Sequence, residues 1–400
     1  MTEEHEIEEE IKRFPLPEVP EAWDTIERPE HSIPDAMSYN YFPYSQVSSA
    51  LQKSIRRCEW PEAAFWAMEA FRTGPRCATN IVRRLYIMAV EDIGPANPSL
   101  VVFIDDLFDP DTPRDSIKDL RIVLDVVELL TKSYKDRTND WAAIPDVSAL
   151  PEPMAELSEA YLLSQLTCLK DTLQRRNFEQ AAEYANRIYC LHQRYPDFSL
   201  PHETSKRWKQ SFKPGAPYRH YKKLSSQFWL PILGVASQEG ANEYVCILVY
   251  RLYHLAVVRS GPLMFRNMKR SDMKLFWMQA IHSICYPENV EESWSQDGQM
   301  RLWADLEADG WQAEAMEKHK SRELVYAMPD YAVDKHTKSH SPETANRGTE
   351  HFMDHGGRIR HHHAFRDAQQ KYWLRKAVQK LKAQGKLKQE YKLPENYFNL

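Results

Sequence analysis

The chain has 400 residues, of which 42% are hydrophobic and 27% charged, and its formal net charge is -5. These fractions are close to globular averages and exclude a wholly disordered chain, and no apolar run is long enough to predict a transmembrane helix. Glycine is scarce, with 12 residues in the chain, and this favours helices over phosphate-binding loops and tight hairpins. At about 150 residues per domain, the length indicates two or three packed units.

The N-terminus and the cysteines indicate the compartment. Residues 1–43 form an acidic leader, whereas a signal or transit peptide would be basic. The six cysteines are scattered and include no C-x-x-C pair, which is typical of reduced thiols and not of a disulfide framework or a thiolate zinc site. We therefore expect a soluble, intracellular protein of the cytoplasm or nucleus that has no membrane partner.

Residues 44–98 show the periodicity of three short helices. Apolar side chains recur every four residues in the first helix, Gly74-Pro75 stops the second, and Gly94 suits the C-terminal cap of the third. Two antiparallel helices with a third packed across them are the simplest arrangement. The residues expected to be buried together in this unit are Leu51, Ile55, Trp66, Leu85 and Met88.

The apolar run that begins at Leu100 ends in Asp105-Asp106, a pattern similar to the metal-binding strand end of a nucleotide-binding domain. No G-x-x-x-x-G-K-[ST] loop occurs anywhere in the sequence, so nothing would hold the phosphates of a nucleotide. We therefore expect no nucleotide cofactor, and no other cofactor is indicated. The proline-rich residues 144–154 are a plausible linker.

Helical periodicity continues beyond this linker, and strand-like alternation is scarce. The pattern divides the chain after the leader into a first helical region (44–145), a second (146–325), and a C-terminal part (326–400) with a histidine-rich segment and a basic helix. No repeat of fixed period is visible, which disfavours a solenoid. The predicted fold class is all-α, as a multi-helix bundle with irregular proline-rich connections.

The first helical region resembles a known signature. In order, its elements are Ser49-Ala50-Leu51, Lys53-Ser54, Ala63-Ala64, Arg83-Arg84 and Glu91-Asp92-Ile93-Gly94. They are similar to the helical, collar-like region that follows the ATPase core in the family of replication-associated recombination protein A and the Werner-helicase-interacting ATPase. The resemblance covers about 55 residues, and only some 45 residues precede it. It therefore implies a clamp-loader-like collar without the ATPase core, which would oligomerise and contact DNA or replication proteins.

A second, shorter resemblance is to divergent proteins of large DNA viruses. The matching residues are Asp334-Lys335-His336-Thr337 and Glu350-His351-Phe352. The resemblance suggests a viral version of the collar-like protein.

A basic-aromatic segment at 204–223 contains no acidic residue. Cations interleaved with aromatic rings suit single-stranded nucleic acid, because phosphates require charge and bases require stacking surfaces. The alternative is a solvated loop whose aromatic rings pack inward. Arg83-Arg84 would add cations, since one of two consecutive helical side chains must leave the core, although a pair with Glu91 or Asp92 is equally compatible. The predicted nucleic-acid-binding residues of the segment are Lys206, Arg207, Trp208, Lys209, Lys213, Arg219, Lys222 and Lys223.

Histidines at 334–363 are the weaker candidate site. His351 and His355 are four residues apart, which places two imidazoles on one helical face, and His336 precedes them. H-x-x-x-H without a central glutamate is a weak metal motif, so no metal site is assigned. Contact with phosphate or simple exposure are the alternatives.

These observations predict a non-enzymatic accessory protein of DNA replication or repair that forms a homo-oligomer and binds DNA, preferably single-stranded, and replication proteins. The alternative is a structural or assembly protein, for example of a virus, that keeps the helical scaffold without binding nucleic acid. A third hypothesis is a metal-dependent nuclease that uses the histidines at 334–363. No catalytic residue is identifiable, because neither G-x-S-x-G nor the context of a catalytic cysteine occurs.

Overall fold

A computed structural model describes residues 37–108, 120–146, 159–194, 228–258, 270–294, 311–334, 337, 348–360 and 367–398. Throughout these ranges the regular structure is helical, with one isolated antiparallel bridge between Met37 and Pro43 and no strand. The predicted all-α fold class is therefore confirmed. Within the same ranges, no helix is both long and apolar enough to cross a membrane.

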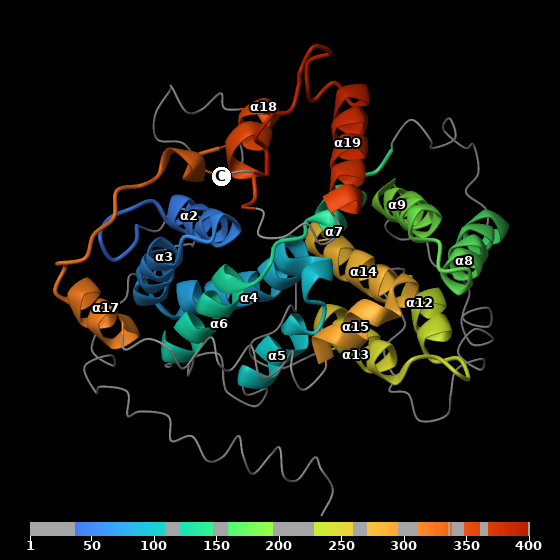
Figure 1. Cartoon of the computed structure of the whole chain (residues 1–400), viewed down its shortest axis with the longest axis horizontal. Helices are drawn as coiled ribbons and strands as arrows, with labels where there is room; N and C mark the ends of the chain where they lie inside the picture. The colour runs from blue at the N-terminus through green and yellow to red at the C-terminus, as the bar shows by residue number, and fades with distance from the viewer. Residues whose placement is uncertain are drawn as a thin grey trace, which may run out of the picture.

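The first helical unit forms where the apolar stripes predict it. The side chains of Leu51, Ile55, Trp66, Leu85 and Met88 are all fully buried in one apolar core. The unit contains a fourth helix that packs against the second, and it occupies the blue-to-teal side of the molecule in Figure 1. Its helices are α2 (Tyr44–Arg57), α3 (Trp60–Arg72), α4 (Pro75–Met88) and α6 (Leu120–Lys132).

The end of the third predicted helix differs from the expectation of one continuous helix. Helix α4 stops at Met88 and continues as a π-helical turn, η3 (Ala89–Ile93), and then as a short 3-10 turn, η4 (Gly94–Ala96). Gly94 has a φ of +47°, and a Cβ there would lie 2.7 Å from the backbone oxygen of Asp136. The position therefore requires glycine, both for its backbone conformation and for the close approach of another segment.

The apolar run with the aspartate pair is a helix, α5 (Leu100–Leu107), and not a strand end. Asp105 is buried, accepts a hydrogen bond from the Tyr86 hydroxyl at 3.1 Å, and lies 3.0 Å from the Arg251 guanidinium. Its carboxylate therefore joins α5 to neighbouring helices and does not have the geometry of a metal-binding strand end.

The second half of the molecule packs around a central helix. In Figure 1, α14 lies between the first unit and the helices on the green and yellow side. It contacts the π-helical turn and α7 on one side and α9 and α12 on the other. Trp277 on α14 is buried, and its ring lies 3.7 Å from that of Phe228. The elements of this half are α7 (Thr138–Ala142), α8 (Glu159–Gln174), α9 (Phe178–Arg194), α12 (Trp229–Ala236), α13 (Glu243–Tyr253), η7 (His254–Val258), α14 (Arg270–Cys285) and α15 (Pro287–Trp294).

The C-terminal part returns to both halves. Helix α17 packs against α3, the short turn η8 against α2, and helix α19 against α7. One apolar core includes side chains from all three predicted helical regions. The elements of this part are α17 (Trp311–Lys320), η8 (Asp330–Ala332), α18 (Thr349–His351), η9 (Phe352–Gly356) and α19 (Asp367–Ala383).

The scarcity of glycine has a local consequence at helix ends. Cys58, Arg176, Arg322 and Gly385 each have a positive φ, between 53° and 67°, just after a helix. Each sits between the two backbone hydrogen bonds of a Schellman cap, such as Glu323 N–H to Lys318 O at 2.8 Å. Glycine is the usual residue there, and the three side-chain-bearing residues adopt a conformation that is unfavourable for them.

Candidate functional site

The Glu91-Asp92 pair of the collar-like signature forms the centre of a buried charge cluster. Arg56, at the end of α2, lies 2.6 Å from Glu91 and 2.6 Å from Asp92. Arg137, at the start of α7, lies 3.0 Å from Glu91 and 2.5 Å from Asp140. Both guanidiniums are almost fully buried. Two cations thus face three carboxylates inside the protein, at the π-helical turn that carries the acidic pair.

The buried charges hold the C-terminal part in place. Arg56 also donates to the Gly356 carbonyl at 2.7 Å, and Arg137 donates to the Gly357 carbonyl at 2.8 Å. The Tyr397 hydroxyl donates to the same Gly357 oxygen at 3.0 Å. A guanidinium has five donors in a fixed plane, so one side chain can bind a carboxylate and a carbonyl together. We call Arg56, Glu91, Asp92, Arg137 and Asp140 the charge clasp.

The electrostatics of the charge clasp follow from burial and from its two arginines. Burial alone would raise the pKa of Glu91, but the guanidiniums of Arg56 and Arg137 outweigh it and hold that pKa below its ordinary value. Burial raises the pKa of Asp92, and the adjacent Glu91 carboxylate raises it further. Because both guanidiniums and Asp92 are buried and each is bound by groups of the chain itself, the chemistry of the clasp suits assembly of the fold.

A second buried ion pair lies beside the clasp. Lys53 on α2 donates to the Asp334 carboxylate at 2.6 Å, and both side chains are almost inaccessible. Burial lowers the pKa of Lys53 to about 8, although Asp334 opposes the shift. Gly356 passes so close that a Cβ would lie 2.8 Å from both the Asp334 carboxylate and Lys53 Cε. Asp334 is therefore a structural partner of α2.

The predicted cations Arg83 and Arg84 lie on α4, and both are half-buried. Arg84 donates to the Gln52 side chain at 2.7 Å, and its positive charge also lowers the pKa of Glu91. Arg83 interacts within the chain as well. Arg84 is thus used within the chain through Gln52 and not through a direct ion pair with Glu91 or Asp92 that the structure describes, and nucleic-acid contact by Arg83 and Arg84 remains a prediction.

The basic-aromatic segment 204–223, with its predicted residues from Lys206 to Lys223, lies outside the described residues, as does His336. His351 and His355 are described, and their ring centroids are 4.6 Å apart. Among the residues that the structure describes, no group of three or more His, Cys, Asp or Glu side chains could hold a metal ion. The four-residue spacing therefore brings the two imidazoles together, but the described residues add no third ligand for a metal ion.

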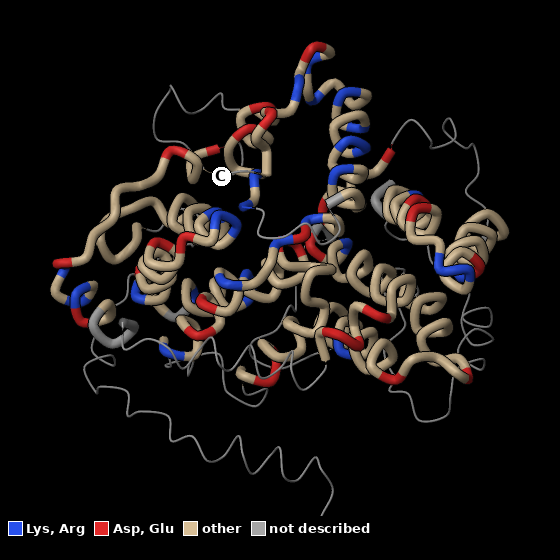
Figure 2. The backbone as a smooth tube through the Cα atoms, viewed as in Figure 1, with Lys and Arg blue, Asp and Glu red and all other residues tan. Residues whose placement is uncertain are grey.

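Helix α19 and the residues that follow it carry a run of basic side chains. Residues 368–389 contain seven lysines and arginines and no acidic residue, and two of the seven lie beyond the end of the helix. Figure 2 shows basic residues along the length of the helix. On one side, Lys376 pairs with Glu179 and Lys380 lies 2.8 Å from Glu183, both on α9. On the other side, Lys371 and Arg375 are exposed. The helix thus uses part of its charge for packing and leaves part of it facing solvent.

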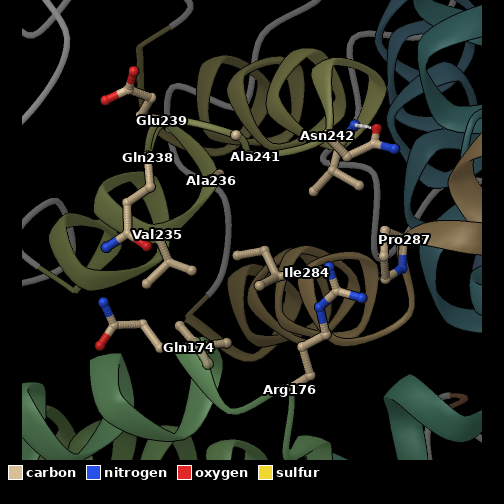
Figure 3. Close-up of a pocket in the computed structure, with 13 residues that line it drawn as sticks. Gln174, Arg176, Val235, Ala236, Gln238, Glu239, Ala241, Asn242, Ile284 and Pro287 are labelled. Atoms are coloured by element: carbon tan, nitrogen blue, oxygen red, sulfur yellow. Dashed lines mark hydrogen bonds between the residues drawn. The ribbon is translucent and has the colours of Figure 1, made fainter.

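A pocket among the described residues lies between the α8–α9 turn, the α12–α13 connection and the end of α14. Figure 3 shows Val235 and Ile284 forming apolar walls, with the side chains of Gln174 and Arg176 on one side. Its volume is about 190 Å³, below the roughly 300–1,000 Å³ of typical ligand pockets. The pocket is therefore small for a drug-sized ligand or a large cofactor.

Comparison with protein-family models, with curated proteins and with solved structures found no match for this chain. The resemblance of residues 44–98 to a clamp-loader-like collar therefore rests on its own residues. The structure adds that Lys53, Asp92 and Gly94 of that signature are buried at or beside the charge clasp, and that Glu91 is half-buried in it.

Sequence reasoning missed most of the residues that join distant segments. Arg56, Arg137 and Asp334 were not singled out as partners, because their contacts cross long stretches of chain. The sequence did contain a local sign of another buried contact, because Glu69 is a lone acid within the apolar run of α3. It is fully buried and lies 3.3 Å from His319. A charge within an apolar helical face is a usable sign of a buried polar partner.

Proposed function

We propose that this chain is a non-enzymatic DNA-binding accessory protein, with the exposed face of α19 as a principal contact. The observation that carries the proposal is the acid-free run of residues 368–389. Within it, Lys371 and Arg375 are exposed on one side of α19. Cations four residues apart lie on the same helical face. Lysine and arginine on such a face bind phosphate groups and release their counterions.

The packing of α19 supports the proposal because it fixes which side of the helix faces solvent. Lys376 and Lys380 are matched by Glu179 and Glu183, so these two lysines set the orientation of the helix. The exposed cations Lys386 and Lys392 follow beyond the end of the helix. The result is a stripe of positive charge on a rigid support, within a chain whose net charge is -5.

The biological setting of this proposal comes from the collar-like resemblance. That resemblance favours a role in DNA replication or repair, assembly into a homo-oligomer, and contact with replication proteins. Preference for single-stranded DNA comes from the basic-aromatic segment 204–223, whose aromatic residues offer stacking surfaces. Both features are part of the proposal.

The test is fluorescence anisotropy with labelled single-stranded and duplex oligonucleotides over a salt series. Affinity should fall linearly with salt on logarithmic axes, because each phosphate contact releases counterions. The double variant Lys371→Ala with Arg375→Ala removes two cations from the face that binds phosphate. It should therefore reduce the slope by roughly 1.8 units for duplex DNA and about 1.4 units for single strands.

The matched control removes two exposed cations at other helices, with Arg121→Ala on α6 and Arg175→Ala beside the end of α8. This control should keep the wild-type slope. Wild-type protein without salt-sensitive binding would contradict the proposal and favour the structural or assembly role. An unchanged slope in the α19 double variant would instead remove α19 from the contact surface.

A further inference from the structure

The loop that precedes α2 carries an exposed aromatic residue in an unfavourable conformation. Ser38 N–H donates to the Phe42 carbonyl at 2.7 Å, and Tyr41 N–H donates to the Ser38 carbonyl at 2.9 Å, which closes a tight turn. Tyr41 has a φ of +65°, a region that glycine or asparagine normally occupies in such loops. Its side chain is 71% exposed. Neither burial nor backbone preference therefore explains a tyrosine at this position.

Hydrogen bonds to a buried carboxylate of α3 hold the same loop in place. The buried Glu69 carboxylate accepts hydrogen bonds from the Ser38 hydroxyl at 3.0 Å, from Asn40 N–H at 2.6 Å and from the Asn40 side chain at 3.1 Å. Hydrogen bonds to a charged acceptor are stronger than those between neutral groups. The loop therefore presents Tyr41 in a fixed position, which lowers the entropy cost of binding anything against the ring.

A cation from a distant part of the chain lies against this loop. The Arg322 guanidinium lies 5.1 Å from the Tyr39 ring and 5.9 Å from the Tyr41 ring. The Tyr39 hydroxyl donates to the Lys320 carbonyl at 3.3 Å, which fixes the loop to the end of α17. Arg322 itself has a φ of +62°. The positive φ of Arg322 belongs to the helix cap of α17, which fixes the backbone that carries this guanidinium, whereas the positive φ of Tyr41 lies in a loop.

We propose that Tyr41 is a stacking platform for a base of single-stranded nucleic acid, and that Arg322 contacts the neighbouring phosphate. An exposed ring stacks on any base, and a guanidinium beside it supplies both charge and a cation–π contact. The Arg322 guanidinium beside the Tyr41 ring favours an anionic partner with flat rings, such as nucleic acid, over an apolar protein segment. The inference rests on the proposed DNA binding but uses a surface separate from α19.

The decisive variant is Tyr41→Gly, which removes the ring and suits the positive φ. Affinity for a labelled oligodeoxythymidine should fall roughly 5- to 150-fold, the loss expected for one base–aromatic stack. Duplex affinity and the salt slope should stay at wild-type values, because stacking releases no counterions. Thermal stability should not decrease, so loss of binding cannot come from unfolding. Tyr41→Phe, which keeps the ring, should bind single strands with wild-type affinity.

Two controls match the two changes that Tyr41→Gly makes. Arg176→Gly relieves a positive φ at another site, and Tyr134→Ala removes another exposed tyrosine. Both should bind oligodeoxythymidine as the wild type does. Wild-type affinity in Tyr41→Gly would overturn the platform and leave the α19 proposal intact. Conversely, a loss in Tyr41→Gly with an unchanged salt slope in the α19 variant would support the platform and contradict the α19 contact.

Discussion

The charge clasp and helix α19 use basic side chains in opposite ways. Arg56 and Arg137 are buried and face three carboxylates, whereas Lys371 and Arg375 are exposed in a run without acids. A buried cation must be matched, because leaving an unpaired charge out of water is costly. An exposed cation costs little and can be reached by a partner. The surroundings of a basic residue, and not its charge, therefore decide whether it holds the fold together or stays accessible to solvent.

Both patterns are present inside α19 itself. Lys376 and Lys380 face acidic residues of α9, whereas Lys371 and Arg375 lie on the side of the helix that faces solvent. A count of lysines and arginines in this helix would assign all of them to one role. The structure divides them by face, so the number of side chains that can contact phosphate is smaller than the sequence suggests.

The largest expected effect comes from breaking the clasp. Arg56→Ala leaves Glu91 and Asp92 short of a cation and removes the bond to Gly356, so we expect a loss of about 3–5 kcal/mol in the free energy of unfolding. Urea unfolding followed by circular dichroism measures it. Arg375→Ala on α19 is the matched control and should change stability by no more than about 0.5 kcal/mol. Equal losses of stability in the two variants would contradict the claim that buried cations stabilise the fold more than exposed ones.

The sequence predicts the first unit well because its signals are local. The four-residue recurrence of Leu51 and Ile55 and the stop at Gly74-Pro75 lie within single helices, and the predicted burial is confirmed for every residue named. The basic C-terminal helix was predicted for the same reason. Periodicity indicates which face of a helix is buried, but it does not indicate which other helix covers that face.

The clasp and the ion pair beside it could not be predicted in this way. Lys53 and Asp334 are 281 positions apart in the chain, and no local pattern connects them. The π-helical turn at Ala89–Ile93 was also missed, since one extra residue per turn leaves no mark in the spacing of apolar side chains. The positive φ of Tyr41 is likewise set by its surroundings, because Glu69 fixes the loop from another helix.

A smaller effect should come from the buried His319, which has the Glu69 carboxylate beside it. Burial lowers the pKa of His319, although the nearby Glu69 opposes the shift. Below about pH 6.5 the unfolded chain takes up a proton that the folded chain resists, so His319 should reduce stability as the pH falls. The expected slope is at most about 1.4 kcal/mol per pH unit for one proton.

Urea unfolding at several pH values between neutral and mildly acidic measures this slope. His319→Phe keeps an aromatic ring between Tyr39 and Phe65 and should flatten the profile, whereas His355→Gln, at an exposed site, should not. If the wild type and His319→Phe lose stability in parallel on acidification, other groups determine the acid sensitivity. Burial of a titratable group would then affect stability at the clasp and not at His319.

The smallest expected effect concerns an exposed cation, Arg176, whose backbone conformation is unfavourable. Arg176 ends α8 in a Schellman cap with a φ of +53°, where a Cβ is strained and glycine is not. Arg176→Gly should therefore stabilise the fold, but only by roughly 0.5–1 kcal/mol, because glycine also gains entropy in the unfolded chain. Gly385→Ala makes the reverse change in an equivalent cap and should destabilise by a similar amount. The pair isolates backbone conformation from charge, since only one of the two substitutions removes a cation. Stabilisation by Arg176→Gly without destabilisation by Gly385→Ala would mean that relief of local charge, and not of the backbone, produced the gain.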